Sequence, residues 1–181
     1  SIFSGSVSVG TSGAADFDGH GTNVAGIAAG ATDNGFGYAD IGYDSMLQVY
    51  RIFDPNNAGS ASSADEALAI RHAIANGARV INLSLGSAQA TGPDAVEEAA
   101  VEDAIDAGVA VVAAAGNESA SSLDFPAAYP RVISVGASAF NNPQSGSVLG
   151  GHEIIASYSN TSPDLTLLAP GGDPLNELDS D

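Results

Sequence analysis

Residues 79–118 read RVINLSLGSAQATGPDAVEEAAVEDAIDAGVAVVAAAGNE, and this stretch decides the fold. Two short apolar runs, 79–83 and 109–114, flank a longer segment with the pattern of a helix. Pro93 opens this segment and Gly108 stops it, and proline in the first turn with glycine past the last turn marks the two ends of a helix. Strand, helix and strand in this order predict a parallel βαβ unit, with the first strand buried.

The same alternation extends toward the N-terminus. The run at 47–53 predicts the first strand of the sheet, and a second helical segment follows it. We expect this helix to start at Ser63, whose hydroxyl caps it while Glu66, three residues later, completes a capping box. Asn76 and Gly77 mark the end of the helix.

Two further apolar runs follow toward the C-terminus. The runs at 131–135 and 165–168 predict strands, and the Gly/Asn/Ser-rich stretch 141–151 between them predicts an exposed loop. With 181 residues, 44% of them hydrophobic, the chain can bury one core. We therefore expect a single α/β unit over residues 1–181: a doubly wound, mainly parallel sheet with helices on both faces.

The charge balance excludes several classes of partner. Four basic residues, all of them arginine, stand against 22 acidic residues, which gives a formal net charge of -18. Such a surface repels nucleic acid phosphates and anionic lipids, and it fits a secreted or salt-adapted protein. The chain has no cysteine, so disulfides, thiolate metal sites and a cysteine nucleophile are excluded. The longest apolar stretch, 109–115, is far shorter than the roughly 20 residues of a membrane helix.

The strongest motif is DGHGTNVAGIAA at residues 18–29. Glycines flank His20 and permit close backbone approach, and the small residues that follow let a helix pack tightly. A histidine held at the start of a helix can serve as a general base. On this stretch alone, a histidine in an ordinary glycine-rich turn explains the pattern equally well.

Two more motifs stand at the ends of predicted strands. The strand at 109–114 runs into Gly116 and Asn117, and a side-chain amide at the carboxyl end of a parallel strand can donate to a developing oxyanion. The strand at 79–83 runs into Ser84, Leu85 and Gly86, whose backbone can bind an extended peptide by strand addition. A turn asparagine and a simple strand-to-loop transition are the alternatives for these two motifs.

Taken in order, these three motifs resemble the subtilase family of serine peptidases. The resemblance runs from about Asp16 to Gly171 and includes FPAAYPRVISVGA at 125–137, ASYSN at 156–160 and LAPG at 168–171. It implies a subtilisin-like fold and a secreted, extracellular enzyme that hydrolyses polypeptides by a Ser-His-Asp mechanism.

The resemblance also implies a role for each matching residue. His20 would be the general base and Asn117 the side-chain donor to the oxyanion. One wall of the substrate cleft would be formed by Ser84, Leu85 and Gly86.

The sequence departs from the family pattern at two catalytic positions. Neither the Asp-Ser/Thr-Gly strand upstream of the histidine nor the Gly-Thr-Ser-Met-Ala-Ala-Pro helix downstream is found. Asp16 and Asp18 lie too close to His20 in sequence to orient its ring, and we expect them to shape the turn. We therefore expect residues 1–181 to form a partial peptidase domain, inactive alone, whose partners are a polypeptide substrate and the remainder of the catalytic domain.

Other candidate residues have weaker support. GTSGAA at 10–15 echoes the nucleophile motif but precedes the histidine, so we interpret it as a loop. His72 and His152 have no second ligand at metal-binding spacing, and we expect surface positions for both. The mechanism requires no cofactor. Asp33 and Asn34 offer oxygen ligands where many subtilases carry a structural calcium ion.

A non-catalytic alternative remains open from the sequence. A degenerate subtilase fold that holds peptides or partners without cleaving them would show the same three motifs. A nucleotide-binding α/β domain is disfavoured, because no glycine-rich phosphate motif follows a strand and the net charge has the wrong sign.

Overall fold

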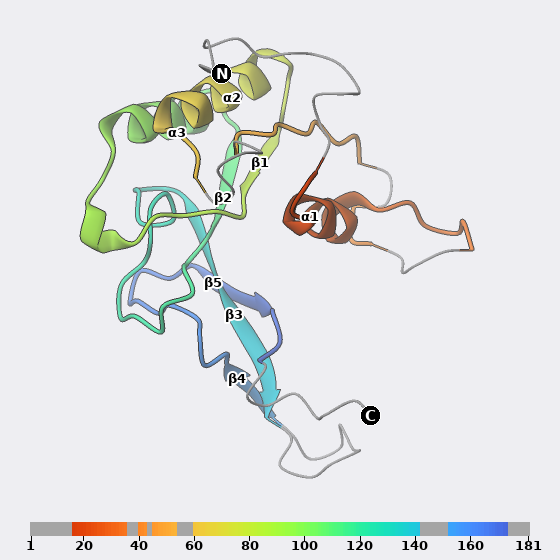
Figure 1. Cartoon of the computed structure of the whole chain (residues 1–181), viewed down its shortest axis with the longest axis vertical. Coiled ribbons are helices and arrows are strands. Elements are labelled where there is room, and N and C mark those ends of the chain that lie inside the picture. Colours follow the sequence, from red (N-terminus) through yellow and green to blue (C-terminus); the bar gives the residue numbers. More distant parts are fainter. Residues whose placement is uncertain (1–15, 36–39, 43–44, 54–59, 142–151, 174–181) are drawn as a thin grey trace. The chain divides into compact units, whose positions relative to one another are not determined.

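The computed structural model describes residues 16–35, 40–42, 45–53, 60–141 and 152–173 (Figure 1). The chain divides into two compact units, Ser1–Ala78 and Arg79–Asp181. Among the described residues, the N-terminal unit contains two helices, α1 (His20–Ala29) and α2 (Ser63–Ala75). The C-terminal unit contains the strands.

Helix α2 lies where the sequence predicts it, but its cap is one residue earlier. The N-cap is Ser62, whose hydroxyl accepts from the Asp65 backbone N–H at 3.1 Å and donates to the Asp65 carboxylate at 2.7 Å. The prediction of Ser63 and Glu66 as the capping pair is therefore wrong. Glu66 is buried instead, because it lies one position beyond Asp65 and therefore points to another side of the helix.

Glycines end α2 and α3 (Ala95–Asp106) in the same way. Gly77 and Gly108 have φ of 76° and 81°, a left-handed conformation that glycine adopts without steric cost. In each case the glycine N–H and the next N–H bond back to carbonyls of the last helical turn, which is the Schellman motif. Both predicted helix ends are confirmed.

The start of α3 differs slightly from the prediction. Asp94 is the N-cap and accepts from the backbone N–H groups of Val96 and Glu97 at 2.8 and 3.2 Å. Pro93 therefore lies just outside the helix instead of opening it. An aspartate provides the acceptor that the first helical N–H groups need, and proline does not.

The predicted strand at 47–53 is wrong. Described residues 45–53 form no strand, and two of their side chains contact α2 and its C-cap. Gln48 donates to the carbonyl of Asn76 at 3.1 Å, and the Tyr50 hydroxyl lies 3.0 Å from Nδ1 of His72. Because a strand forms only where a neighbouring backbone pairs with it, the apolar run alone did not suffice.

The C-terminal unit is built on a mainly parallel sheet of five strands in its described residues. These are β1 (Val80–Leu83), β2 (Ala110–Ala114), β3 (Ile133–Asn141), β4 (His152–Ile155) and β5 (Leu167–Pro170). β1 with β2, β2 with β3 and β3 with β5 pair parallel, and only β3 with β4 pairs antiparallel. Figure 1 shows β3 as the long cyan strand, and this strand pairs with β2, β4 and β5. The predicted mainly parallel α/β architecture is confirmed.

The core lies between α3 and β2. Ala100, Val101 and Ala104 of the helix and Val111 and Ala113 of the strand are each at most 1% exposed. Small side chains at helical spacing let the helix approach the sheet closely. In β1, Ile81 and Leu83 are buried whereas Val80 and Asn82 are exposed, so the prediction of a buried strand holds for one face.

The segment after β3 was only partly predicted. Residues 142–151 of the predicted loop lie outside the described part of the chain. Asn141 ends β3, and His152, which is exposed as expected, opens β4 directly opposite Asn141. The short HEII run carries too few residues to show a strand pattern without its partner.

Candidate active site

His20 is the first residue of α1, and the turn before it is held by Asp16. Gly19, the N-cap, has φ of 98°. The Asp16 carboxylate accepts from the backbone N–H groups of Gly19 at 2.9 Å, Thr22 at 2.8 Å and Asp18 at 3.0 Å. It also accepts from the Thr22 hydroxyl at 2.7 Å. The structure thus confirms that Asp16 shapes the turn that presents the exposed His20.

The electrostatics of this turn follow from the same contacts. The ionised carboxylate of Asp16 is stabilised first by the Gly19 backbone N–H, and then by the hydroxyl and backbone N–H of Thr22 and the backbone N–H of Asp18. The pKa of Asp16 therefore lies well below its usual range. Asp18 accepts from the His20 backbone N–H at 3.2 Å. Both aspartates therefore bind backbone groups, as the sequence predicts.

Asn117 is exposed on a loop that begins where β2 ends. The residue before it, Gly116, has φ of 114°, and a Cβ there would overlap the side chains of Asn160 and Asp124. Only glycine fits this turn. The Asn117 backbone N–H donates to Oε2 of Glu118 at 2.8 Å. No described residue is hydrogen-bonded to the Asn117 side-chain amide.

The predicted cleft wall follows the neighbouring strand. Ser84, Leu85 and Gly86 come directly after β1, which pairs parallel with β2 so that Leu83 lies opposite Ala113. The carboxyl ends of parallel strands meet at one edge of a sheet, so these residues and Asn117 emerge at the same edge. Asn82 donates to the Ser84 hydroxyl at 2.8 Å.

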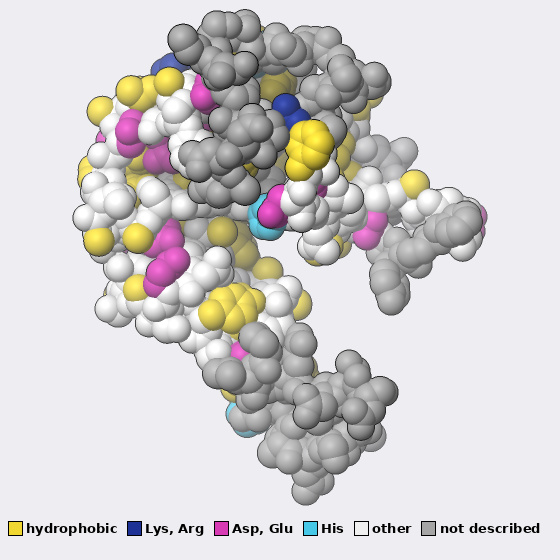
Figure 2. Space-filling model, in the orientation of Figure 1, with side chains coloured by type: hydrophobic (Ala, Val, Ile, Leu, Met, Phe, Trp, Pro, Cys, Tyr) yellow, Lys and Arg dark blue, Asp and Glu magenta, His cyan; other side chains and the backbone are white. Residues whose placement is uncertain are grey.

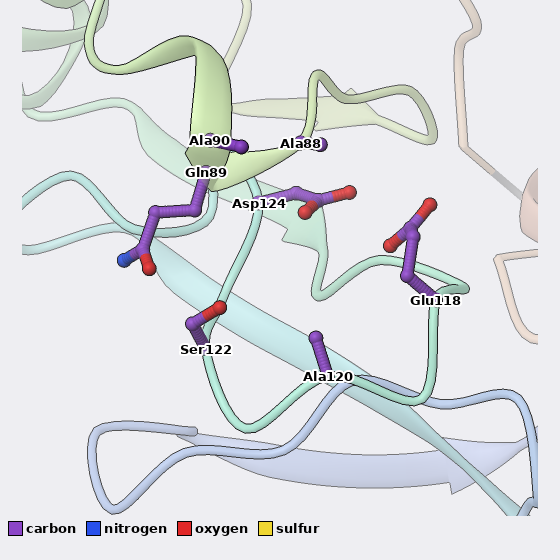
Figure 3. A pocket seen from close by; sticks show the side chains of 7 residues that line it. All are labelled: Ala88, Gln89, Ala90, Glu118, Ala120, Ser122 and Asp124. Carbon is purple, nitrogen blue, oxygen red and sulfur yellow. The ribbon is translucent and has the colours of Figure 1, made fainter.

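A pocket of about 310 Å³ opens at this edge of the sheet. Its walls come from the segment after β1 and from the loop that carries Asn117 (Figure 3). The lining residues are Ala88, Gln89, Ala90, Glu118, Ala120, Ser122 and Asp124. Figure 3 shows the carboxyl groups of Glu118 and Asp124 facing one another.

Burial and mutual repulsion separate the pKa values of these two carboxyl groups. Burial, and then the charge of Glu118, raise the pKa of Asp124. Burial also acts to raise the pKa of Glu118, but hydrogen bonds from the Asn160 side chain and the Asn117 backbone outweigh it and lower the pKa.

Sequence reasoning missed the residue that holds this loop together. Asn160 is fully buried and hydrogen-bonds to Glu118, Ala120 and Asp124. The only signal was its place in the ASYSN block at 156–160, which carried the family resemblance without a role for any one residue.

The candidate catalytic residues belong to different units. His20 lies in the N-terminal unit, whereas Asn117 and the cleft wall at 84–86 lie in the C-terminal unit. The structure thus places Asn117 and residues 84–86, the candidates for the oxyanion donor and the cleft wall, at one edge of the sheet. That His20 faces the same cleft stays a prediction.

The candidate calcium loop is described only in part. Asp33, with φ of 56°, and Asn34 are exposed in a turn, and residues 36–39 lie outside the described ranges. Calcium takes six to eight oxygen ligands, and nowhere in the described part of the chain do three His, Cys, Asp or Glu side chains cluster suitably for a metal.

The remaining histidines and the surface fit the sequence analysis in part. His72 is half-buried, and its ring packs against the ring of Tyr50 with centroids 5.5 Å apart. It therefore lies only partly at the surface. Figure 2 shows Asp and Glu side chains on the visible face and few Lys or Arg. Across the described ranges, no helix has the length and apolar character needed to cross a bilayer.

Comparison with known proteins identifies the family. The family model described as "Subtilase family" matches residues 4–181 of this chain. A thermophilic serine proteinase of Bacillus sp. (strain AK1) is 40% identical over 90% of this chain and 37% of its own length. The halolysin-like extracellular serine protease Nep of Natrialba magadii is 38% identical over 90% of this chain and 27% of its own length. Subtilisin Savinase of Lederbergia lenta is 38% identical over 86% of this chain and 52% of its own length.

Solved structures give the same result. A protease from Pseudoalteromonas arctica superimposes with a TM-score of 0.68 at 28% identity, over 83% of this chain and 43% of that chain. The patellamide maturation protease PatA gives a TM-score of 0.54 at 34% identity, over 66% and 41%. The chain spans about a quarter to a half of the length of these curated relatives. The matched family, the parallel sheet and the strand-end motifs together establish that this chain belongs to the subtilase family.

Proposed function

We propose that this chain is part of a serine endopeptidase that hydrolyses peptide bonds by a Ser-His-Asp mechanism. The observation that carries the proposal is the position of Asn117, exposed at the carboxyl end of β2 beside the residues that follow β1. Carboxyl ends of parallel strands are where α/β proteins place their sites. Relatives named as serine proteases, at about 40% identity, support the reaction class.

Each residue has a defined task in this mechanism. His20 takes the proton from the attacking serine and later donates it to the leaving amine. The Asn117 side-chain amide donates a hydrogen bond to the oxyanion as negative charge develops on the carbonyl oxygen. Ser84, Leu85 and Gly86 bind the extended substrate through their backbone groups, as an added strand would.

The serine and the orienting aspartate are absent from the family positions of this sequence. Without a nucleophile, His20 and Asn117 cannot form an acyl-enzyme, so residues 1–181 alone are inactive in this proposal. The partners are a polypeptide substrate and the remainder of the catalytic domain. Secretion is proposed because the chain is strongly acidic and a similar protein is named as extracellular.

The test uses the full-length gene product that contains residues 1–181. It should cleave a protein substrate and react with a fluorophosphonate at a serine downstream of residue 181. His20→Ala should abolish both while leaving the melting temperature unchanged, since His20 is exposed. Peptide binding without cleavage or labelling would instead identify the non-catalytic alternative.

A further inference from the structure

One fully buried asparagine, Asn160, is bonded to both arms of the loop that carries Asn117. Its Oδ1 accepts from the backbone N–H groups of Glu118 at 3.0 Å and Ala120 at 2.9 Å. Its Nδ2 donates to Oε2 of Glu118 at 2.8 Å and Oδ1 of Asp124 at 3.2 Å. An asparagine amide has two donor hydrogens and two acceptor lone pairs, so these four bonds use its whole capacity.

Backbone contacts reinforce the same attachment. The Asn160 backbone N–H donates to the carbonyl of Gly116 at 3.0 Å, and Ser119 N–H donates to the carbonyl of Tyr158 at 2.9 Å. Thr161 N–H donates to the carbonyl of Ala120 at 2.9 Å. Residues 158–161 are therefore bonded to the loop on both sides of Asn117. The Thr161 hydroxyl adds one bond to the carbonyl of Ala120 at 3.4 Å, whereas the side chain of Asn160 makes four bonds.

The connection to Asn117 runs through Glu118. Oε2 of Glu118 accepts from Asn160 Nδ2 and also from the backbone N–H of Asn117, each at 2.8 Å. Asn160 thus fixes the acceptor of the Asn117 N–H, and it fixes the next backbone N–H directly. Because the carbonyl of Gly116 is held as well, the backbone is restrained immediately before and after Asn117.

We propose that Asn160 is a positioning residue that holds Asn117 where its amide can donate to the oxyanion. The inference rests on the proposed oxyanion role of Asn117. A donor must lie within hydrogen-bond distance of the oxyanion before the charge develops, and a loop that moves loses much of that stabilisation. Asn160 touches no reacting atom in this proposal and acts through the loop.

A double-mutant cycle on the full-length protein tests the inference. Asn117→Ala should lower kcat by about 10²- to 10³-fold, the range known for removal of this donor in a subtilisin. Asn160→Ala should lower kcat by about 10- to 100-fold, because a small displacement of the loop moves the Asn117 amide away from the oxyanion. KM should change little in either variant, since the oxyanion exists only beyond the ground state. If Asn160 acts through Asn117, the double variant should be no slower than Asn117→Ala.

Two further variants separate positioning from folding. Tyr129→Phe removes a buried hydroxyl whose bonds go to α3, so it should lower the melting temperature without changing kcat. Glu118→Ala breaks the link between Asn160 and the Asn117 N–H at an exposed residue, and it decides the matter if Asn160→Ala does not fold. Glu118→Ala should lower kcat, and again not further in the Asn117→Ala background.

The possible results are distinguishable. Multiplying losses in the double variants, or a wild-type kcat in Asn160→Ala and Glu118→Ala, would overturn the positioning role while leaving peptidase activity intact. An undiminished kcat in Asn117→Ala would overturn the oxyanion role itself, and with it the inference. Coupled losses at constant KM support both.

Discussion

The Tyr129 hydroxyl donates a 2.7 Å hydrogen bond to the buried carboxylate of Glu97 on α3. The same oxygen accepts from the Asp94 backbone N–H at 3.0 Å, so it joins the helix start to the segment before β3. Burial and then the bond to Glu97 raise the pKa of Tyr129 above its usual range. This contact stabilises the fold at a distance in sequence from every candidate catalytic residue.

Tyr129→Phe should therefore destabilise the protein without affecting chemistry. The substitution leaves the Glu97 carboxylate and the Asp94 N–H short of a partner, which costs about 1–3 kcal/mol for a buried group. Urea unfolding should show a lower midpoint at an unchanged slope. A midpoint equal to that of the wild type would show that solvent replaces the hydroxyl.

Asp124→Asn should stabilise the protein at neutral pH. Asp124 has a raised pKa in the folded state, so the folded state disfavours its ionised form, and this cost is present above the folded pKa. The cost disappears as the pH falls below the unfolded value of about 3.9. Asparagine keeps the acceptor for Asn160 and carries no charge, so the melting temperature should rise at pH 7 and match the wild type in acid.

Glu118→Gln is the matched control and should have the opposite sign. The pKa of Glu118 is lowered on folding, so its ionised form contributes stability above the unfolded pKa and this is lost as the pH falls through the folded pKa. The glutamine variant should be less stable than the wild type at pH 7. Equal shifts in both variants would mean that the two carboxyl groups do not differ in environment.

Asp16→Ala should disturb the turn before His20. The variant loses an acceptor for three backbone N–H groups and one hydroxyl. Because the pKa of Asp16 is lowered, its contribution is present above the ordinary aspartate pKa and is lost in acid. The full-length variant should show a reduced kcat/KM at pH 7. Asp18→Ala, which removes a single bond to the His20 N–H, should have a smaller effect.

Calcium should raise thermal stability if the loop that begins at Asp33 binds it. A ligand that binds only the folded form raises the melting temperature with its concentration. The expected result is a modest rise on calcium titration of the full-length protein, reduced in Asp33→Ala. A melting temperature that is unchanged by calcium, with the variant equally indifferent, would count against the site.

The isolated chain of residues 1–181 should not react with a fluorophosphonate probe. Such probes label activated serines, and this sequence has none at the family position. Ser12 lies in the GTSGAA stretch, outside the described residues. Labelling at Ser12 that His20→Ala abolishes would reveal a rearranged active site and overturn the interpretation of that stretch as a loop.

The sequence predicted those features that depend on short-range chemistry. Gly77 and Gly108 end their helices because only glycine fits the left-handed turn without strain, and that requirement is visible in one dimension. Gly116 likewise occupies a position of positive φ, directly after β2, and so leads the chain into the loop that carries Asn117. Each of these signals acts within a few residues.

Features that depend on distant partners were not predictable. Ser62 caps the helix because its hydroxyl pairs with Asp65, whereas Glu66, the expected partner of Ser63, is buried. Two adjacent serines look alike in sequence. The short strand that starts at His152 exists because β3 extends far enough to pair with it. Asn160 meets its partners across some 40 positions, and no local pattern announces such a contact.

Gly116 and Asn160 also constrain each other's evolution. A Cβ at position 116 would collide with the side chains of Asn160 and Asp124, and the φ of 114° disfavours any side chain there, so a smaller residue at position 160 alone does not make room. A smaller residue at 160 also leaves the neighbouring backbone N–H groups without their acceptor. A single substitution at either position is therefore unfavourable, so this corner of the protein resists single-step change.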